Sequence, residues 1–184
     1  MKLKIFFLAF VFLCGPVFAE TAYFDKNTGY SFPVSIADFG FNDKNEYGDA
    51  ELGYGLNYWY KNEVLITVIV YNMGIDGIKN GIKGTHVLSQ HGQANTDVGR
   101  AVDAGHYKSA KEISVSQDLS SHFLRSSFDI VRRDDTHVRS HLFLRGQDGY
   151  FIKVRASGKE VEDFDKKVAE FLEQLFVIVS PNKY

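Results

Sequence analysis

The segment VLITVIVYN, residues 64–72, constrains the fold more than any other part of the chain. Apolar side chains occupy both alternating sets of positions, whereas a strand with one wet face would alternate apolar and polar residues. This pattern predicts a central strand of a sheet that is buried on both faces. Because a sheet cannot bury its own faces, we expect helices to cover at least one of them.

The preceding segment, LGYGLNYWY, is expected to pair with this central strand through a turn at residues 61–63. Leucine and tyrosine occupy one alternating set of its positions, and the other set contains Gly53, Gly55, Asn57 and Trp59. Because Gly53 and Gly55 have no side chains, this strand face leaves room for a large neighbouring side chain or a helix to pack there. The groove beside this strand is therefore a candidate binding site for a partner protein or a small apolar ligand.

The remaining elements follow from turn residues and periodicity. A hairpin is expected around the turn at residues 27–29, with Pro33 ending its second strand or placing it at an edge. Residues 36–50 are expected to form an ordered loop. The other expected elements are a helix over residues 80–103 that breaks near Gly92, a strand over 106–119, a three-strand meander over 120–158 and a helix over 158–176.

This order of elements predicts an α+β fold, in which an antiparallel β-sheet is flanked by helices as an α/β/α sandwich. Strands joined by tight turns must be antiparallel, and two amphipathic helices need a sheet to cover. Residues 20–184 are expected to form a single domain, since their number is typical of one domain.

Residues 1–19 have the pattern of a secretory signal peptide. Lys2 and Lys4 precede an apolar run, and short residues at Val17 and Ala19 favour cleavage after Ala19. The apolar run is too short to span a bilayer of about 30 Å. Cys14 is a weaker alternative as a lipid attachment site, because Leu13 stands where such sites need a small residue. We therefore expect a periplasmic or secreted protein without a membrane span in the mature chain.

Charge and cysteine content narrow the function classes. Loss of Lys2 and Lys4 leaves 19 basic against 23 acidic residues, a formal charge of −4 with histidine neutral. That balance argues against a nucleic-acid or anionic-membrane surface. The only cysteine is Cys14, so the mature chain is expected to have neither a disulfide nor a cysteine nucleophile.

The stretch GIDGIKNGIKGTH, residues 74–86, invites comparison with a phosphate-binding loop. A Walker motif needs four residues between its glycines and a lysine directly before Ser or Thr. Here only three residues separate Gly77 from Gly81, and Gly84 stands between Lys83 and Thr85. A dinucleotide fingerprint is absent as well. We therefore expect the glycines to serve backbone turns, and we expect no cofactor.

Six histidines raise the possibility of a metal, but their spacing argues against one. His137 and His141 share a strand face about 13 Å apart, too far to bind one ion. His86 and His91 diverge around a helix. A site assembled from separate loops stays open as an alternative. No G-x-S-x-G elbow indicates a serine hydrolase.

Arginines are frequent in the expected meander, where they could bind a carboxylate or an acidic partner. Nearby aspartates favour the simpler interpretation of a solvated sheet face with cross-strand ion pairs. The candidate ligand or partner surface combines residues from the two hairpin regions: Tyr54, Tyr58, Trp59, Arg139 and Arg145.

The segments FDKNTGYSFPVSI, LGYGLNYWYKNEVLITVIVYN and YFIKVRASG, followed by the C-terminal FDKKVAEFLEQL, resemble the Mog1/PsbP-like group in their order. The resemblance implies a small exported or accessory domain with a sheet between helices. It implies a binding or accessory role rather than catalysis, and it carries over no functional residues because no catalytic motif defines that group.

We therefore expect an exported, non-enzymatic binding or accessory protein of the bacterial envelope or secreted fraction, with an unknown protein partner or small ligand. The alternative is a hydrolase or metal-dependent enzyme with a site built from separate loops. The two differ in whether histidines and carboxylates meet in a concave pocket.

Overall fold

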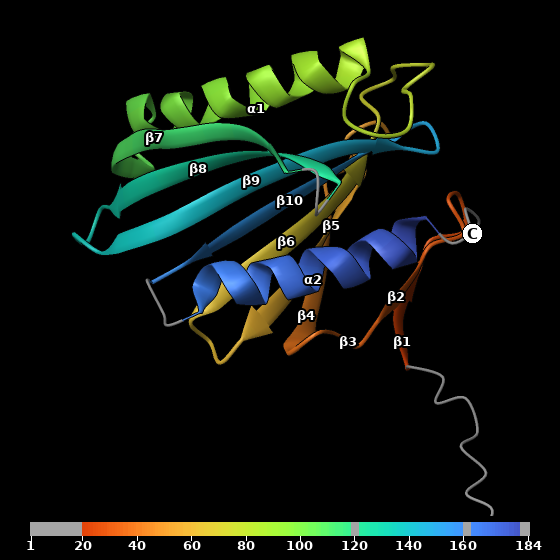
Figure 1. Cartoon of the computed structure of the whole chain (residues 1–184), viewed down its shortest axis with the longest axis horizontal. Coiled ribbons are helices and arrows are strands. Elements are labelled where there is room, and N and C mark those ends of the chain that lie inside the picture. The colour runs from red at the N-terminus through yellow and green to blue at the C-terminus, as the bar shows by residue number, and fades with distance from the viewer. Residues whose placement is uncertain (1–19, 119–121, 160–162, 181–184) are drawn as a thin grey trace, which may run out of the picture.

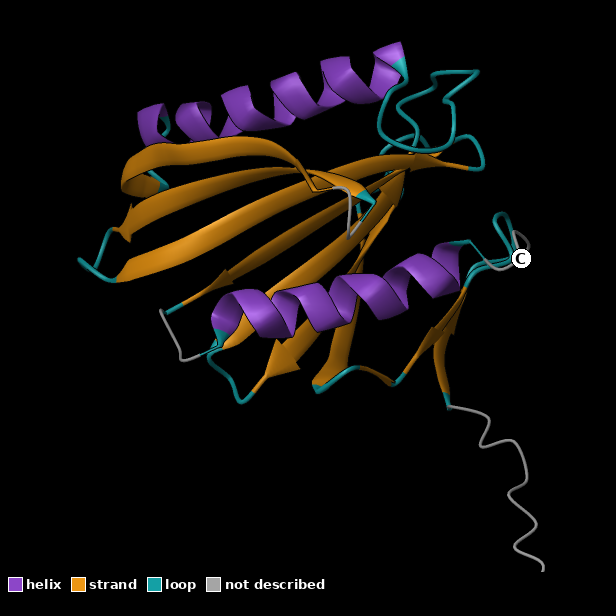
Figure 2. Ribbon diagram, in the orientation of Figure 1, coloured by secondary structure: helices purple, strands orange, loops and turns teal. Residues whose placement is uncertain are grey.

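A computed structural model describes residues 20–118, 122–159 and 163–180. The expected signal peptide, residues 1–19, lies outside the described residues. Ten strands and two helices make up the described chain, and the strands form a two-stranded and an eight-stranded sheet (Figures 1 and 2). The strands are β1 (Thr21–Phe24), β2 (Ser31–Pro33), β3 (Ser35–Ile36), β4 (Phe39–Glu46), β5 (Tyr54–Tyr60), β6 (Val64–Tyr71), β7 (Tyr107–Asp118), β8 (Phe123–Arg132), β9 (His137–Gln147) and β10 (Tyr150–Gly158), and the helices are α1 (Thr85–Asp103) and α2 (Phe164–Val179).

The large sheet is antiparallel throughout and has the order β3-β4-β5-β6-β10-β9-β8-β7. Strand β6 lies near its middle, between β5 and β10, which confirms the prediction of a central strand. The prediction that both faces of this strand are buried is wrong for one face, on which Leu65, Thr67 and Ile69 are only partly buried. The expected β5–β6 turn is also confirmed. Lys61 and Asn62 both have positive φ, at 50° and 57°, as the two central residues of a type I′ hairpin turn do.

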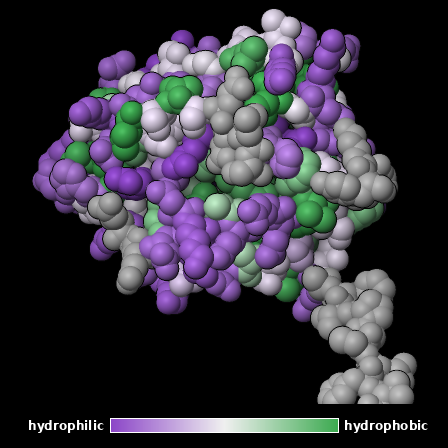
Figure 3. All heavy atoms as spheres, in the orientation of Figure 1, coloured by the Kyte–Doolittle hydropathy of each residue, from purple (hydrophilic) through white to green (hydrophobic). Residues whose placement is uncertain are grey.

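Two helices lie on opposite faces of this sheet (Figure 1). On one face, Phe171, Leu172 and Leu175 of α2 pack against alternate residues of β5, β6 and β10. On the other face, Val87, Ala94 and Val98 of α1 pack against β8 and β9. The outward surface of α2 is largely hydrophilic (Figure 3). Among the described residues, neither helix is apolar enough over a sufficient length to cross a membrane.

The predicted fold class, an α+β sandwich flanked by helices, is wrong. The described residues are 48% strand and 23% helix, so the fold is β-rich, with an eight-stranded antiparallel sheet and only two helices. One reason is the segment expected to be an ordered loop, residues 36–50, which instead contains β4. Another is the length of β7, β8 and β9, at 12, 10 and 11 residues. The two helices cover only parts of so wide a sheet.

The first helix also departs from the expected bounds. It begins at Thr85 instead of residue 80 and continues through Gly92 to Asp103 without a break. Residues before it are held in a loop, because Gly81 has a φ of 94° and exchanges two backbone hydrogen bonds with Gly146. Ile78 and Ile82 are buried beside α1. The glycine stretch is thus a backbone connection, as expected.

Candidate ligand-binding groove

One half of the sheet face beneath α1 has no helix over it. Helix α1 packs on β8 and β9, while alternate residues of β5, β6 and β10 on the same face extend beyond it. On β6 these are Leu65, Thr67, Ile69 and Tyr71, and on β10 they include Lys153 and Arg155. This open face lies between the helix and the β4 edge.

A hollow of about 780 Å³ runs between α1 and this open face, and we call it the α1 groove. Its size is within the range of small-molecule sites. The groove is formed by β6, β10, α1 and the connections on either side of the β5–β6 hairpin. Its lining residues are Tyr47, Leu52, Ile69, Tyr71, Met73, Gln90, Gln93, Asp97, Arg100 and Lys153.

One wall of the α1 groove is apolar. Tyr47, Leu52 and Met73 are 42–45% exposed, which is unusual for large apolar side chains that stand next to one another. The Tyr47 ring lies across Gly55, where an added Cβ would be 2.4 Å from the tyrosine hydroxyl oxygen. The expected large neighbour of the glycine face is thus Tyr47. By lying over Gly55, it closes one end of the groove.

The floor of the α1 groove carries a positive charge. Nζ of Lys153 lies 5.2 Å from the centroid of the Tyr71 ring, whose hydroxyl accepts a hydrogen bond from Nε2 of Gln90 at 3.1 Å. Burial lowers the pKa of the Lys153 ammonium, against the attraction of Asp97. Asp97 is itself paired with Arg100 of the same helix at 2.9 Å.

A second hollow, of about 210 Å³, lies further along the same face. Arg155 faces Thr67 across the β10–β6 pair, one alternate position beyond the pair of Lys153 and Ile69. The Arg155 guanidinium lies 5.8 Å from the Tyr107 ring centroid, and its Nε donates to Oγ of Ser140 at 3.4 Å. Lys153 and Arg155 therefore place two cations in a row on the open face.

The five residues expected to form a surface do not come together. Tyr54 and Tyr58 are core residues on the α2 face, where their hydroxyls donate to Asp25 at 2.9 Å and to the Pro33 carbonyl at 3.0 Å. Trp59 is half-buried on the open face. The prediction that Tyr54 and Tyr58 offer a surface is therefore wrong, because their side chains point into the core.

Arg145 is also buried. Its guanidinium lies 4.5 Å from the Phe176 ring centroid and donates to Oε1 of Gln147 at 2.7 Å. Arg139 lies on the same face of β9 as Arg145, opposite Asp129 of β8, with 3.9 Å between Nε and Oδ1. Neither residue belongs to the α1 groove.

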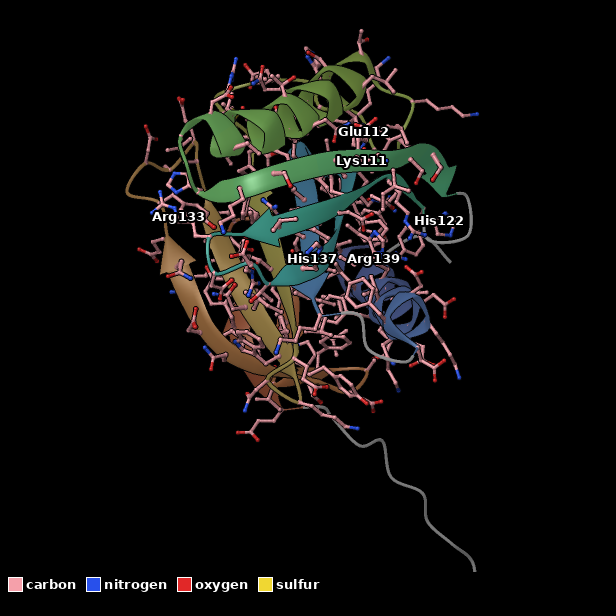
Figure 4. The ribbon with its side chains drawn as sticks, turned by 90° about the vertical axis from the view of Figure 1, so that its left-hand side faces the viewer. Lys111, Glu112, His122, Arg133, His137 and Arg139 are labelled. Atoms are coloured by element: carbon pink, nitrogen blue, oxygen red, sulfur yellow. The ribbon has the colours of Figure 1, made fainter. Side chains whose placement is uncertain are left out.

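A shallow hollow of about 450 Å³ surrounds Arg139. It is lined by residues of β7, β8 and β9, both charged ones such as Lys111 and His137 and apolar ones such as Val131, and Figure 4 looks onto this edge of the sheet. The alternation of Lys111, Asp129 and Arg139 across three neighbouring strands is the solvated, ion-paired sheet face that the sequence favoured.

The described residues contain no group of three or more metal-ligating side chains that could hold an ion. His91 is on the buried face of α1, with its Nε2 3.2 Å from Oγ of Ser126, and His141 lies on the opposite face of the sheet. Of the hollows described above, only the one at Arg139 is lined by a histidine, His137. Asp129 lines the same hollow, but among the described residues it pairs with Arg139 and makes no hydrogen bond with His137, so this hollow does not join a histidine to a carboxylate.

The contact closest to a catalytic geometry joins the buried His141 to Asp165. Nε2 of His141 lies 2.6 Å from Oδ1 of Asp165, and Arg125 donates to the same oxygen at 2.9 Å. The imidazole is 2% exposed and lies over Phe164 at the start of α2. This cluster attaches the helix to β8 and β9, and no hollow described above reaches it.

The His141 cluster predicts a loss of stability in mild acid. Burial and the Arg125 charge lower the pKa of His141 from 6.5 to about 4, even though Asp165 opposes the shift. The unfolded chain therefore takes up the proton first. Stability is complete above about pH 6.5 and falls by about 3 kcal/mol as the pH falls to 4. Urea unfolding at pH 7 and pH 5 measures the part of this loss that falls between these two pH values, about 2 kcal/mol.

His141→Gln is the control for this prediction, since it removes the titrating group at a similar size. The variant should lose clearly less stability between the two pH values than the unmodified protein. A remaining slope is expected from His91, whose pKa is also lowered by burial. Equal slopes in the two proteins would contradict the assignment to His141.

No protein-family model matches the chain, and no curated protein matches it significantly. The site must therefore be judged on its geometry alone. Sequence reasoning pointed to the groove beside Gly53 and Gly55 but missed Lys153. The available signal was a lysine between Ile152 and Val154 in a strand that is otherwise apolar at that end.

Proposed function

We propose that this protein is an exported, non-enzymatic binding protein that holds a small amphipathic ligand in the α1 groove. The observation that carries the proposal is a hollow of about 780 Å³ with exposed apolar side chains along one wall. Exposed apolar side chains that adjoin a hollow are a common mark of ligand sites. Export is proposed from residues 1–19 alone.

The groove supports binding better than catalysis. Its polar residues are two glutamines, a lysine, two tyrosines and the Asp97–Arg100 pair. This set lacks the arrangement of a nucleophile hydrogen-bonded to a general base that hydrolysis needs. The proposed Mog1/PsbP-like relationship points in the same direction, because it implies an accessory or binding role.

Titration with the neutral apolar dye N-phenyl-1-naphthylamine tests this function, since its fluorescence rises in an apolar site. We expect saturable binding to the purified protein. Leu52→Asp should weaken it by at least tenfold, because the change puts a charge in the apolar wall. Leu52 is exposed, so the substitution should leave the fold intact.

Val177→Asp is the matched control, since Val177 is an exposed apolar residue on α2, on the other face of the sheet. It should bind the dye as the unmodified protein does. The proposal fails if the unmodified protein does not bind the dye, or if both variants lose binding equally.

A further inference from the structure

The two cations on the open sheet face have no anionic partner within the described chain. The ion pairs of the described residues include neither Lys153 nor Arg155. Lys153 contacts the Tyr71 ring, and Arg155 contacts the Tyr107 ring and a serine hydroxyl. Surface lysines usually project into water, but Lys153 is held against an aromatic ring in the groove.

The nearby carboxylates already have other partners. Asp97 binds Arg100 at 2.9 Å and accepts a hydrogen bond from Gln93 at 2.9 Å. On the open face, Oδ1 of Asp43 accepts hydrogen bonds from the amides of Asn45 and Asn57. The α1 groove is therefore lined by two cations, Lys153 and Arg100, and by one carboxylate, Asp97, which is already paired with Arg100.

A partly buried cation without an ion-pair partner lowers the stability of the fold unless another interaction offsets the cost. Partial burial of an ammonium disfavours its charged form; at Lys153 the attraction of Asp97 opposes this effect and the repulsion of Arg155 adds to it. The two side chains are two residues apart on one strand, about 7 Å along it. Their charged ends have different neighbours, because Nζ of Lys153 lies over the Tyr71 ring and the Arg155 guanidinium lies over the Tyr107 ring. An anion bound to Lys153 would lie near the Gln90 amide, which donates to the Tyr71 hydroxyl.

We propose that the ligand is a single-chain amphiphile with an acidic head group of the carboxylate type, an inference that rests on the proposed function. The head group binds Lys153, and Arg155, two residues further along β10, adds a second positive charge on the same face. The apolar chain runs along Ile69, Leu52 and Met73 toward Tyr47. The apolar wall supplies affinity for the chain, while the two cations select the charge of the head group.

Three ligands of equal chain length test the head group: dodecanoate, 1-dodecanol and dodecylamine, each used to displace N-phenyl-1-naphthylamine below its micellar concentration. The unmodified protein should bind dodecanoate at least tenfold more tightly than dodecanol, and dodecylamine most weakly. Equal affinities for the three would overturn this inference and leave the proposed function standing. Failure of the dye itself to bind would overturn both.

Lys153→Met locates the selectivity, since methionine keeps much of the side-chain volume without the charge. The variant should bind dodecanol as before and lose at least tenfold in affinity for dodecanoate. Lys83→Met, at an exposed lysine outside the groove, should retain the preference. A preference for dodecanoate that survives Lys153→Met overturns the assignment, as does equal loss in the Lys83 variant.

The comparison of ligands on the unmodified protein keeps the inference testable if Lys153→Met does not fold. In that case Lys153→Arg, which keeps the charge, should retain the preference for dodecanoate. Circular dichroism of each variant establishes whether it is folded before its affinity is measured.

Discussion

Gly53→Ala is expected to abolish folding or to lower the free energy of unfolding by most of its value. An added Cβ would lie 1.8 Å from the Val70 carbonyl oxygen and 2.9 Å from its carbonyl carbon. Both atoms belong to the backbone of β6, which pairs with β5 from Tyr54 onward. Relief would require the hairpin to separate at its buried end.

The expected loss is several kcal/mol, against a total of about 5–15 kcal/mol for a typical domain. Gly53 also has a φ of 68°. In this backbone conformation a residue with a side chain costs about a further 1–2 kcal/mol. Circular dichroism and urea unfolding of the purified variant measure the effect. Little soluble protein is an equally expected result.

Gly29→Ala separates the steric clash with β6 from the unfavourable backbone conformation as causes of the loss at Gly53. Gly29 has a φ of 75°, but an added Cβ would meet nothing within 4 Å. This variant should lose only the backbone term of about 1 kcal/mol. If the Gly53 and Gly29 variants lost equal stability, close approach of β6 would not be the reason for a glycine at position 53.

Phe171→Ala should destabilise the protein by about 3–5 kcal/mol, the usual range for a buried phenylalanine. The ring is fully buried in the centre of α2. It lies 5.3 Å from the Phe39 ring and 5.5 Å from the Tyr58 ring, both centroid to centroid and edge-on. Its loss would leave a cavity between the helix and the β4–β5 part of the sheet.

Val177→Ala on the same helix is the control, because that side chain is 64% exposed. It should change the free energy of unfolding by no more than about 0.5 kcal/mol. Urea midpoints for both variants give the comparison. A Phe171 variant as stable as the Val177 variant would show that α2 is not held to the sheet through this contact.

Much of the strand arrangement could be predicted because it rests on local patterns. The both-faced apolar run at β6 predicted a central strand, and the turns at Asn62 and Gly149 marked the hairpins. The segment over residues 36–50 was mistaken for a loop. Its glycines, asparagines and aspartates disfavour strands locally, and only pairing with β5 makes β4 extended.

The candidate site was harder to predict than the strands. Glycines in β5 correctly indicated that something large must lie over that face, but not that it is Tyr47 from outside the strand. Tyr54 and Tyr58 looked like surface residues because aromatic residues suit both cores and binding sites. Lys153 gave too weak a signal, since one charged residue in a strand is usually a solvated one.

By itself, the sequence of this protein determined which segments form strands and helices in most of the chain, and which side of each amphipathic element is apolar. These properties depend on residues close together along the chain. Only the tertiary structure decided that α1 packs on β7, β8 and β9 and meets β6 only at its end, at Tyr71. That choice depends on packing between segments far apart in sequence, and it leaves the Lys153 ammonium in an open groove.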